Sequence, residues 1–470
     1  MSLYGAVRAV AERSPGACAI EETGGESVGY AELLGLTDRI AGGLAAQGVR
    51  AGDCVGFALR NSIGYVALIL ATARLGAHYV PLLSGFSEED VREALDRTRP
   101  VLLVADRDVP AGVPAVSLGL LASADPLPPG GGPQTGVFRV LWSSGSTGFP
   151  KGISWRQDRF VRERRRWLAD TGITETDVFF CRHTLDVAHA TDLHVFAALL
   201  SGARLVLADP AAPPQELLRG LAEYGVTAMS ALPRHYEELT EAAAAVPGVD
   251  LSGIRRALCG GAYLSPAVTR RAREALGLTV REIYGSTEFG LALGDMAGAG
   301  LVPVAGVGAR IEPLAGSPDI GELVLRSDCT SEGYLGHAEA NALTFRGAEF
   351  WTGDLVSRRG NGGYRILGRL TEALATPAGP LLAPVLDEEI TAAGPVAEAV
   401  SLPVHRAAYG NEVLVAVRPR GARTEVASAV HRVLRHHRLN GSVAFVDAVP
   451  RTEVGKVDKP LLRRQLGLRG

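Results

Sequence analysis

The sequence has no large excess of charge of either sign. It contains 48 lysine and arginine residues against 51 aspartate and glutamate residues, which gives a formal net charge of −3 at pH 7. Proteins that neutralise many nucleic-acid phosphates need a basic surface, so the composition argues against a nucleic-acid partner. Of the 470 residues, 47% are hydrophobic and 21% are charged. This composition excludes a mainly disordered chain and predicts a large buried core in more than one domain.

Cysteines are few, and long apolar runs are missing. The five cysteines lie far apart, are odd in number and form no CxxC pair, so neither a disulfide framework nor a zinc site is expected. The most apolar stretch, residues 65–83, is interrupted by Arg74 and Pro81 and does not supply the roughly 20 apolar residues of a membrane span. Residues 1–16 carry charged side chains such as Arg13 where a secretory signal needs an apolar core. We therefore expect a cytoplasmic protein without a membrane partner.

Lysine is scarce. Among the 48 basic residues only three are lysine, namely Lys151, Lys456 and Lys459, and the rest are arginine. On an exposed surface arginine can replace lysine with little consequence, but a planar guanidinium cannot replace a compact ammonium that must fit between two anionic groups. The three lysines are therefore candidates for functional residues, with chance survival as the alternative.

Helical and strand-like periods alternate as in an α/β protein. Expected helices cover residues 30–47, 65–75 and 88–97, and expected strands cover residues 54–59, 78–82, 101–104, 137–142, 203–208, 228–231, 254–259 and 282–284. Such alternation predicts βαβ units and a parallel sheet. The charged run 162–166 is expected to form an exposed helix face.

Two changes of character divide the chain. From residues 321–325 onward, short strands and glycine-rich turns predict a β-rich subdomain. Past Arg369, about a hundred residues have helix and strand patterns of their own, which is enough for a small α+β domain. We therefore predict a large N-terminal domain of parallel-sheet αβ layers, residues 1–368, and a small mobile C-terminal domain, residues 369–470.

The segment that follows the expected strand 137–142 is rich in hydroxyl side chains and glycine. This hydroxyl-glycine loop, residues 143–151, reads SSGSTGFPK. Backbone amides and hydroxyls of such a loop can surround phosphate oxygens, and Lys151 adds a cation. The loop is not a Walker A motif, because no G-x-x-x-x-G-K-[ST] is present. Most loops of this composition are merely flexible connections, but the lysine and the order of residues favour a phosphate site.

Further motifs are spread in order along the chain, most of them after the loop. They read YGSTE at residues 284–288, WTGD at 351–354, GR at 368–369 and PRTEVGK at 450–456, and weaker ones lie at 76–82, 260–262, 321–323 and 333–335. With the hydroxyl-glycine loop, this series resembles that of the adenylate-forming enzymes, which include acyl-CoA synthetases, adenylation domains of peptide synthetases and luciferases. The resemblance extends over essentially the whole chain. All three lysines lie in, or within three residues of, the first and last of these motifs, which makes chance a poor explanation of their survival.

The resemblance implies an ATP-dependent acid–thiol ligase with ATP and Mg²⁺ as cofactors. Such an enzyme joins a small carboxylic acid to AMP, releases pyrophosphate and passes the acyl group to the thiol of coenzyme A or of a carrier protein's phosphopantetheine. The carboxylate and the α-phosphate are both anions, so a cation has to bridge them in the transition state. Lys456 matches the catalytic lysine of the family, and its loss should raise the barrier by several kcal/mol.

The same resemblance implies the other nucleotide-binding residues. The phosphates would be bound by Ser143, Ser144, Gly145, Ser146, Thr147, Gly148, Lys151 and Thr287. Adenine and ribose would be bound by Gly260, Gly261, Ala262, Tyr284, Asp354 and Arg369, and the magnesium ion by Glu288. Standing alone, Asp354 would equally fit a turn and Tyr284 a core position. Their joint occurrence in order favours the functional roles.

The chain departs from the family pattern after Arg369. Thr371 stands where a hinge aspartate is common, and no lysine is nearby. This difference leaves the second half-reaction open. The acceptor is therefore coenzyme A, a carrier protein, or an amine or other nitrogen nucleophile.

The expected acid-binding region is polar. Three of the ten histidines, among them His183 and His189, fall within residues 183–194 together with Asp186. A fatty-acid enzyme would line this region with apolar groups, so His183, Asp186 and His189 indicate a polar or small acid. The alternative is that these residues cap solvated helices, with one histidine near the carboxylate. Metal binding is less favoured, because no two of the histidines are spaced i,i+4 and Mg²⁺ prefers oxygen ligands.

Two rival functions compete with the ligase. A phosphoryl-transfer enzyme that yields ADP is disfavoured by the missing Walker A and kinase signatures. A non-catalytic descendant that only binds a nucleotide is disfavoured because Lys456 survives in a chain nearly without lysine. The product formed from ATP (AMP, ADP or neither) separates the three hypotheses.

Overall fold

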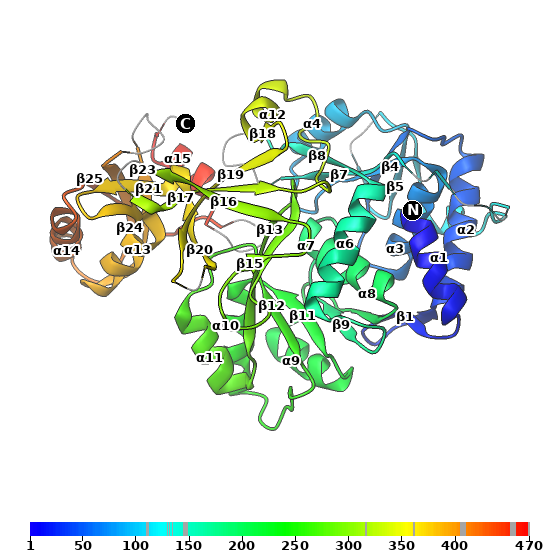
Figure 1. The fold of residues 1–470 in the computed structure, drawn as a ribbon, viewed down its shortest axis with the longest axis horizontal. Coiled ribbons are helices and arrows are strands. Elements are labelled where there is room, and N and C mark those ends of the chain that lie inside the picture. Colours follow the sequence, from blue (N-terminus) through cyan, green and yellow to red (C-terminus); the bar gives the residue numbers. More distant parts are fainter. Residues whose placement is uncertain are drawn as a thin grey trace. The chain divides into compact units, whose positions relative to one another are not determined.

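The computed structural model describes residues 1–109, 112–128, 130, 132–133, 135–143, 149–314, 317–360, 362–404, 410–451 and 457–468. These residues fall into two compact units, whose elements are labelled in Figure 1. Unit 1 is built from described residues of Met1–Ser144, Phe149–Val307 and Ser327–Ala342, and unit 2 from those of Gly308–Arg326 and Leu343–Gly470.

Unit 1 contains a six-stranded sheet in the order β6-β5-β3-β4-β7-β8. Its strands are β3 (Cys54–Ala58), β4 (His78–Pro81), β5 (Leu102–Ala105), β6 (Ala115–Val116), β7 (Val137–Trp142) and β8 (Gly152–Arg156). Neighbours are parallel except β7 and β8, which form an antiparallel pair. The helices of this part are α1 (Leu3–Arg13), α2 (Tyr30–Ala46), α3 (Ile63–Leu75), α4 (Glu88–Thr98), α5 (Leu118–Ala122) and α6 (Gln157–Thr171).

A nine-stranded sheet of unit 1 has the order β15-β14-β13-β12-β11-β9-β10-β1-β2. Its strands are β1 (Cys18–Glu22), β2 (Ser27–Gly29), β9 (Val178–Cys181), β10 (Arg204–Leu207), β11 (Ala228–Ala231), β12 (Arg256–Cys259), β13 (Val280–Ser286), β14 (Gly290–Gly294) and β15 (Val302–Pro303). From β13 to β1 all neighbours are parallel, and the edge strands are antiparallel. The connecting helices are α7 (Ala188–Ala190), the π-helix η1 (Thr191–Val195), α8 (Phe196–Ser201), α9 (Pro214–Glu223), α10 (Pro233–Ala243) and α11 (Pro266–Leu276), and α12 (Ala338–Thr344) lies further along the chain.

The main core of unit 1 is shared by both sheets and by α1, α2, α3 and α8. Helix α3 is buried along nearly its whole length, as expected for a helix that is apolar on all sides. It begins where the Ser62 hydroxyl accepts a hydrogen bond from the Tyr65 amide and ends at Gly76, whose φ is +75°. A second core lies where α9, α10 and α11 cover the nine-stranded sheet.

Unit 2 contains an antiparallel five-stranded sheet followed by smaller elements. The sheet consists of β16 (Gly308–Leu314), β17 (Ser317–Arg326), β18 (Phe345–Arg346), β19 (Glu349–Arg358) and β20 (Tyr364–Arg369). A 3-10 turn η2 (Leu370–Glu372), the hairpin β21 (Ala373–Thr376) and β22 (Gly379–Leu382) and α13 (Ala383–Ala392) follow. The last part has the three-stranded sheet β23 (Val396–Pro403), β24 (Glu412–Pro419) and β25 (Asn440–Phe445), with α14 (Arg423–His436) and α15 (Lys459–Gln465).

The α/β fold class predicted from the sequence is confirmed. Each expected helix and strand is present, with bounds that differ by a few residues. Unit 2 begins earlier than the segment 369–470, because the apolar cluster that contains Leu355, Ala373 and Leu382 joins the five-stranded sheet to the residues after β20. Movement of 369–470 as a domain remains a prediction. In the part of the chain that the structure describes, no helix is both long and apolar enough for a membrane span.

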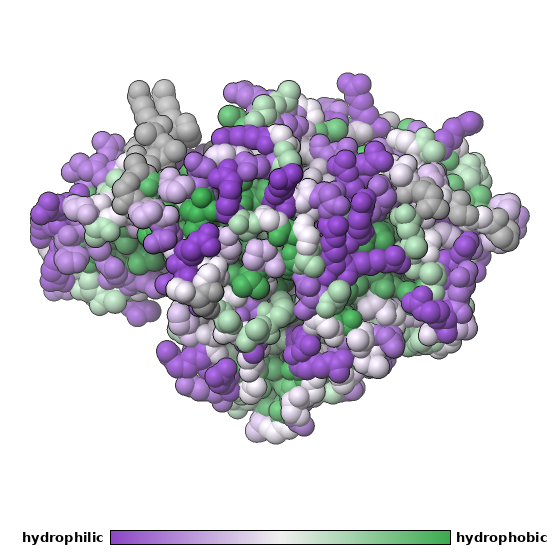
Figure 2. All heavy atoms as spheres, in the orientation of Figure 1, coloured by the Kyte–Doolittle hydropathy of each residue, from purple (hydrophilic) through white to green (hydrophobic). Residues whose placement is uncertain are grey.

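The charged run 162–166 is an exposed face only in part. Figure 2 shows hydrophilic side chains gathered over α6, where two arginines pair with Asp328. Glu163 and Arg164 of the same run are buried and paired with each other. Glu163 also accepts a hydrogen bond from the Leu291 amide at 2.8 Å. The expectation of full exposure is therefore wrong for these two residues, because Glu163 contacts β14 and Arg164 donates to the Asp192 carbonyl of η1.

Candidate active site

The two described ends of the hydroxyl-glycine loop are held together as a hairpin. The Ser143 amide donates to the Lys151 carbonyl at 2.9 Å, and the Lys151 amide donates to Ser143 Oγ at 3.3 Å. These bonds extend the antiparallel pairing of β7 and β8 by one step. The predicted phosphate-binding residues 144–148 lie outside the described residues.

Tyr334 connects the lysine of this loop to the predicted magnesium-binding carboxylate. Lys151 Nζ lies 4.7 Å from the centre of the Tyr334 ring, a cation–π contact. The Tyr334 hydroxyl donates to Glu288 Oε1 at 3.0 Å. The segment that carries Tyr334 is paired with β8, through an antiparallel bridge to Ile153 and a 2.8 Å hydrogen bond from the Leu335 amide to the Gly152 carbonyl. Two motifs that are far apart in sequence are thereby placed side by side.

The turn after β13 carries Thr287 and Glu288 and is anchored from two directions. Trp155 Nε1 donates to the Thr287 carbonyl at 2.7 Å, and the Ser331 amide donates to the Glu288 carbonyl at 3.1 Å. The turn needs Gly290, whose φ is +86° and whose Cβ, if present, would lie 2.6 Å from a Glu163 oxygen. The backbone of this motif is thus fixed before any ligand arrives.

The predicted adenine-binding residues follow two neighbouring parallel strands. Gly260, Gly261 and Ala262 come directly after β12, and Tyr284, half-buried, lies near the end of β13. A side chain at Gly260 would place its Cβ 2.8 Å from the Ile283 carbonyl. Parallel α/β sheets bind ligands at the carboxyl edge of their strands, so these residues lie where a ligand is expected.

Four histidines gather around Ser230, which lies on β11. They are His183 after β9, His189 in α7, His194 in η1 and His235 in α10. Ring centres lie 4.5 Å apart for His183 and His189, 4.9 Å for His183 and His235, and 5.5 Å for His183 and His194. We call this set the histidine quartet. The sequence predicted His183 and His189 as acid-binding residues, and the structure brings these two together.

Ser230 offers each of its polar groups to a different member of the quartet. Its carbonyl lies 3.3 Å from His183 Nε2, its amide donates to His194 Nε2 at 3.3 Å, and its Oγ lies 3.2 Å from His189 Nε2. The Leu232 amide donates to His235 Nδ1 at 3.4 Å. A ring nitrogen that accepts a hydrogen bond carries no proton, so His194 and His235 are neutral in this arrangement.

Burial favours the neutral form of the quartet. His183, His194 and His235 are 8%, 0% and 5% exposed, while His189 is partly exposed. Removal from water lowers the pKa of His194 and of His235 to about 3 and lowers the pKa of His183 well below its ordinary value. Neighbouring rings lower the pKa of His183 and of His194 further. His183, His194 and His235 are therefore uncharged at neutral pH.

One oxygen of Asp186 and the turn that holds part of the quartet have their own partners, whereas Asp186 Oδ1 is buried without a hydrogen bond to any described residue. Asp186 is buried, and its Oδ2 accepts from the amide and the hydroxyl of Ser84 at 2.9 and 3.1 Å. Asp192 of η1 forms a buried two-point ion pair with Arg139 of β7, at 2.8 Å for one pair of atoms. The Arg139 guanidinium lies over the Phe160 ring at 4.3 Å. A π-helical turn is uncommon and is often found at functional sites, and here the ion pair fixes it.

The predicted ribose-binding residues form one network in unit 2. Asp354 and Arg369 are opposite each other on β19 and β20, with a 3.2 Å ion pair between them. Thr352 orients both, since its Oγ1 accepts from the Asp354 amide at 3.0 Å and its carbonyl accepts from Arg369 at 3.0 Å. Glu322 accepts from the Gly353 amide at 2.9 Å. This bond gives a structural reason for the weak motif at residues 321–323.

The segment predicted to carry the catalytic lysine is only partly described. Lys456 lies outside the described residues. Lys459, at the start of α15, forms a 2.7 Å ion pair with Glu372 of η2, and both side chains are 24% exposed. Thr371, the residue that departs from the family pattern, lies in the same turn. One of the three lysines is thus tied to the predicted hinge.

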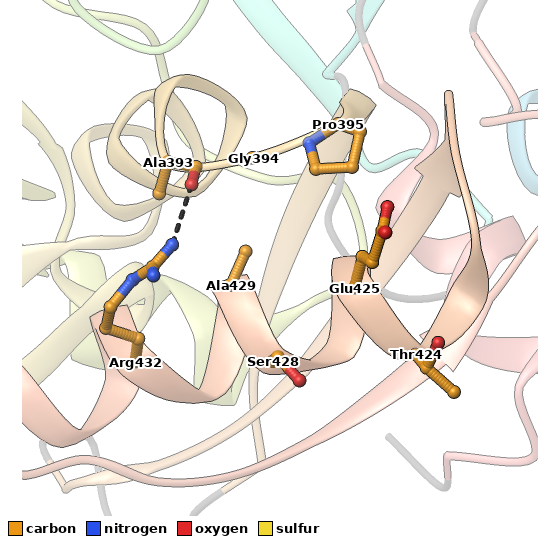
Figure 3. A pocket seen from close by; sticks show the side chains of 8 residues that line it. All are labelled: Ala393, Gly394, Pro395, Thr424, Glu425, Ser428, Ala429 and Arg432. Atoms are coloured by element: carbon orange, nitrogen blue, oxygen red, sulfur yellow. Dashed lines mark hydrogen bonds between the residues drawn. The ribbon is translucent and has the colours of Figure 1, made fainter.

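A surface pocket of unit 2 is separate from all predicted residues. It has a volume of about 450 Å³ and lies between the end of α13 and α14. Figure 3 shows Arg432 of α14 reaching across it to donate to the Ala393 carbonyl, at 2.9 Å. Gly394 lets the end of α13 pack closely against α14, because a Cβ there would lie 2.7 Å from the Ala429 methyl. We assign the pocket to the packing of these two helices and give it no function.

A divalent metal ion has a limited set of protein ligands here. Among the described residues, no group of three or more histidine, cysteine, aspartate or glutamate side chains could hold a metal ion. Glu288 offers a single carboxylate whose Oε1 is oriented by Tyr334. Mg²⁺ is commonly bound by one or two carboxylates together with substrate phosphates, so Glu288 fits this ion and does not fit a zinc site.

Sequence reasoning missed some residues of the site. Tyr334 was expected only as part of a weak motif, and Ser230 and His235 were not singled out. Their position could have indicated them, because Ser230 and His235 fall at or just after the carboxyl end of an expected parallel strand, where ligands bind in α/β sheets.

Comparisons with known proteins complete the description of the site. Residues 7–335 match the family described as AMP-binding enzyme. Feruloyl-CoA synthase of an Amycolatopsis species is 28% identical over 97% of this chain and 97% of its own. The Mycobacterium tuberculosis protein named salicyl-AMP ligase / salicyl-S-ArCP synthetase is 27% identical over 97% of this chain and 89% of its own. Among solved structures, ATP-bound MatB from Rhodopseudomonas palustris matches 99% of both chains with a TM-score of 0.85 at 24% identity, which shows a shared fold.

Proposed function

This chain belongs to the AMP-binding enzymes, the adenylate-forming superfamily, and on that premise we propose which of its residues perform the reaction. The resemblance predicted from the motifs is confirmed. The enzyme is an AMP-forming ligase that converts an acid and ATP into an acyl adenylate and pyrophosphate and then forms a thioester.

The observation that carries the assignment of the phosphate site is the contact of Tyr334 with both Lys151 and Glu288. Lys151, with Ser143 and the loop residues 144–148, binds the phosphates that leave as pyrophosphate. Thr287 contacts the α-phosphate, and Glu288 holds Mg²⁺, which when bound offsets negative charge on the phosphates. Tyr334 orients both charged side chains, so that less reorganisation is needed when ATP binds.

The remaining roles follow from the donor and acceptor character of each group. Tyr284 and residues 260–262 contact adenine. Asp354, already oriented by Arg369, accepts hydrogen bonds from the ribose hydroxyls. Lys456 bridges the attacking carboxylate and the α-phosphate, and residues 369–470 rotate between the two half-reactions.

We propose an aryl acid as the substrate class and a thiol as the acceptor. Support comes from the names of two relatives, a feruloyl-CoA synthase and a salicyl-AMP ligase / salicyl-S-ArCP synthetase, and from the planar rings of the histidine quartet. The thiol belongs to coenzyme A or to the phosphopantetheine of a carrier protein. The five cysteines are all free, which suits the reducing cytoplasm that we propose as the location.

The test is acid-dependent exchange of labelled pyrophosphate into ATP, followed by identification of AMP and of the thioester. We expect exchange with aryl acids, and we expect it to be lost in Lys456→Ala. Lys151→Ala should lower exchange, and Lys151→Arg should not restore it, because the guanidinium is planar and bulky. Release of ADP, or undiminished exchange in Lys456→Ala, would contradict the proposal.

A further inference from the structure

The histidine quartet comes from two stretches of the chain, residues 183–194 and the start of α10, which meet near Ser230 of β11. His183, His189 and His194 lie against the carbonyl, the hydroxyl and the amide of Ser230 respectively. Because Ser230 is on β11 and is 2% exposed, the rings are held by a rigid strand. Preorganised polar groups of this kind discriminate between ligands better than mobile ones do.

The quartet adjoins the residues proposed for the nucleotide. A Cβ on Gly261, which follows β12, would lie 3.9 Å from His189 Nδ1. His189 is also the partly exposed member of the quartet. A group bound next to the adenylate therefore meets His189 first, with the buried rings behind it.

Three arginines close to the quartet in sequence or structure, Arg139, Arg182 and Arg234, are already paired. Arg182 and Arg234 both contact Glu238, at 3.0 and 2.7 Å. Arg139 is paired with Asp192 beneath η1. The hydrogen bonds that His194 and His235 accept from backbone amides are available only to neutral rings. A second negative charge on the acid would thus be buried against the neutral rings of His183, His194 and His235, which is costly.

We propose that the histidine quartet and Ser230 determine specificity by selecting a planar acid whose distal substituent is uncharged and hydrogen-bonding, such as a hydroxyl or amino group, and by rejecting a second carboxylate. The proposal rests on the proposed function, because it takes the acyl adenylate to lie beside Gly261. Imidazole rings offer flat faces to an aromatic ring and both donor and acceptor nitrogens to its substituent.

The experiment measures binding of three non-reactive acyl sulfamoyl adenosines by calorimetry. Their acyl groups are 4-hydroxybenzoyl, 4-carboxybenzoyl and 4-methylbenzoyl, which have similar shape and differ in charge and hydrogen bonding. We expect the hydroxyl compound to bind about 100-fold more tightly than the carboxyl compound and about tenfold more tightly than the methyl compound. A carboxyl compound that binds equally well, or a methyl compound that binds best, overturns the proposal.

Variants connect the preference to the quartet. Ser230→Ala removes only the contact to His189, and His189→Leu removes the partly exposed ring; each should reduce the hydroxyl-over-carboxyl preference to below about tenfold. His431→Leu, an exposed histidine of α14, is the matched control and should keep the preference. Retention of the full preference in both quartet variants overturns the proposal.

Pyrophosphate exchange with the matching free acids distinguishes a failure of the proposed adenylation activity from a failure of the proposed acid specificity. Selective binding of the hydroxyl compound without acid-dependent exchange would contradict the proposed function and leave the specificity proposal standing. Exchange that is faster with terephthalate than with 4-hydroxybenzoate would overturn the specificity proposal and leave the proposed function standing. Absence of binding by all three compounds together with absence of exchange would overturn both.

Discussion

Replacement of Tyr334 by phenylalanine isolates one bond of the proposed phosphate site. The change deletes the hydroxyl that donates to Glu288 Oε1 at 3.0 Å and keeps the ring that lies 4.7 Å from Lys151 Nζ. A hydrogen bond to a charged group is worth about 1.5–3 kcal/mol. Since about 1.4 kcal/mol corresponds to a factor of ten, Tyr334→Phe should lower kcat/KM for pyrophosphate exchange by about 10- to 100-fold.

The dependence of the rate on magnesium shows whether the lost bond acts through Glu288. Tyr334→Phe should need a higher Mg²⁺ concentration for half-maximal exchange, because the carboxylate is no longer oriented. Tyr334→Leu should lose a further factor of about 2–5 through the cation–π contact. In the Glu288→Gln background the Tyr334→Phe change should have little additional effect, as expected for two groups that act as one unit.

The control is another tyrosine whose hydroxyl donates to a carboxylate. Tyr4→Phe removes a 2.8 Å hydrogen bond to Asp38 far from the motifs in sequence, and it should leave exchange and its magnesium dependence unchanged. If Tyr334→Phe has the same exchange rate and the same magnesium dependence as the parent protein, the hydrogen bond from Tyr334 to Glu288 has no role in the reaction.

Three further predictions concern the nucleotide, the buried ion pair and pH. Asp354→Asn weakens the acceptor proposed for ribose and the pairing with Arg369, so KM for ATP should rise about tenfold, and an unchanged KM would contradict the role. Arg139→Met leaves Asp192 buried and unpaired and should cost about 3–5 kcal/mol in urea unfolding, whereas the double variant Arg139→Met/Asp192→Leu should recover much of this loss; equal losses would argue against the ion pair as the cause. Desolvation raises the pKa of Asp387 to about 7, so its stabilising contribution is present below the ordinary value of 3.8 and is lost as pH rises through 7. The urea midpoint of Asp387→Asn minus that of the parent should therefore increase between about pH 4 and 7 and stay constant above pH 7. A difference that does not depend on pH would contradict this assignment.

The periodic elements were predictable because each is determined by local pattern. The apolar run at residues 65–75 falls within α3, which the structure buries almost completely. The motif residues Thr287, Glu288 and Asp354 were predictable through their order along the chain, and they lie on turns or strands that hold them firmly.

Contacts between distant segments were not predictable in the same way. Nothing in the local pattern indicates that Tyr334 donates to Glu288, 46 residues away, or that His183 and His189 contact Ser230, which lies 47 and 41 residues further on. The burial of Arg164 within a charged run has the same origin, because its carbonyl partner, Asp192, lies 28 residues further on. The roles of all the predicted site residues, including Lys456 and residues 144–148, stay predictions.

Because the histidine quartet is attached to the backbone and hydroxyl of Ser230, natural selection or protein engineering can change the preference for an acid separately from the binding of ATP. The quartet lies on α7, η1, α10 and the end of β9, whereas Lys151, Tyr334 and Glu288 are connected through β8 and the turn after β13. Two of the four contacts with the quartet are made by backbone groups of Ser230, to His183 and His194, and a substitution of His189 or of the Ser230 side chain leaves the groups of both contacts in place. With the proposed roles, a new acid preference is therefore accessible by one or two substitutions, without changes in the residues proposed to bind ATP.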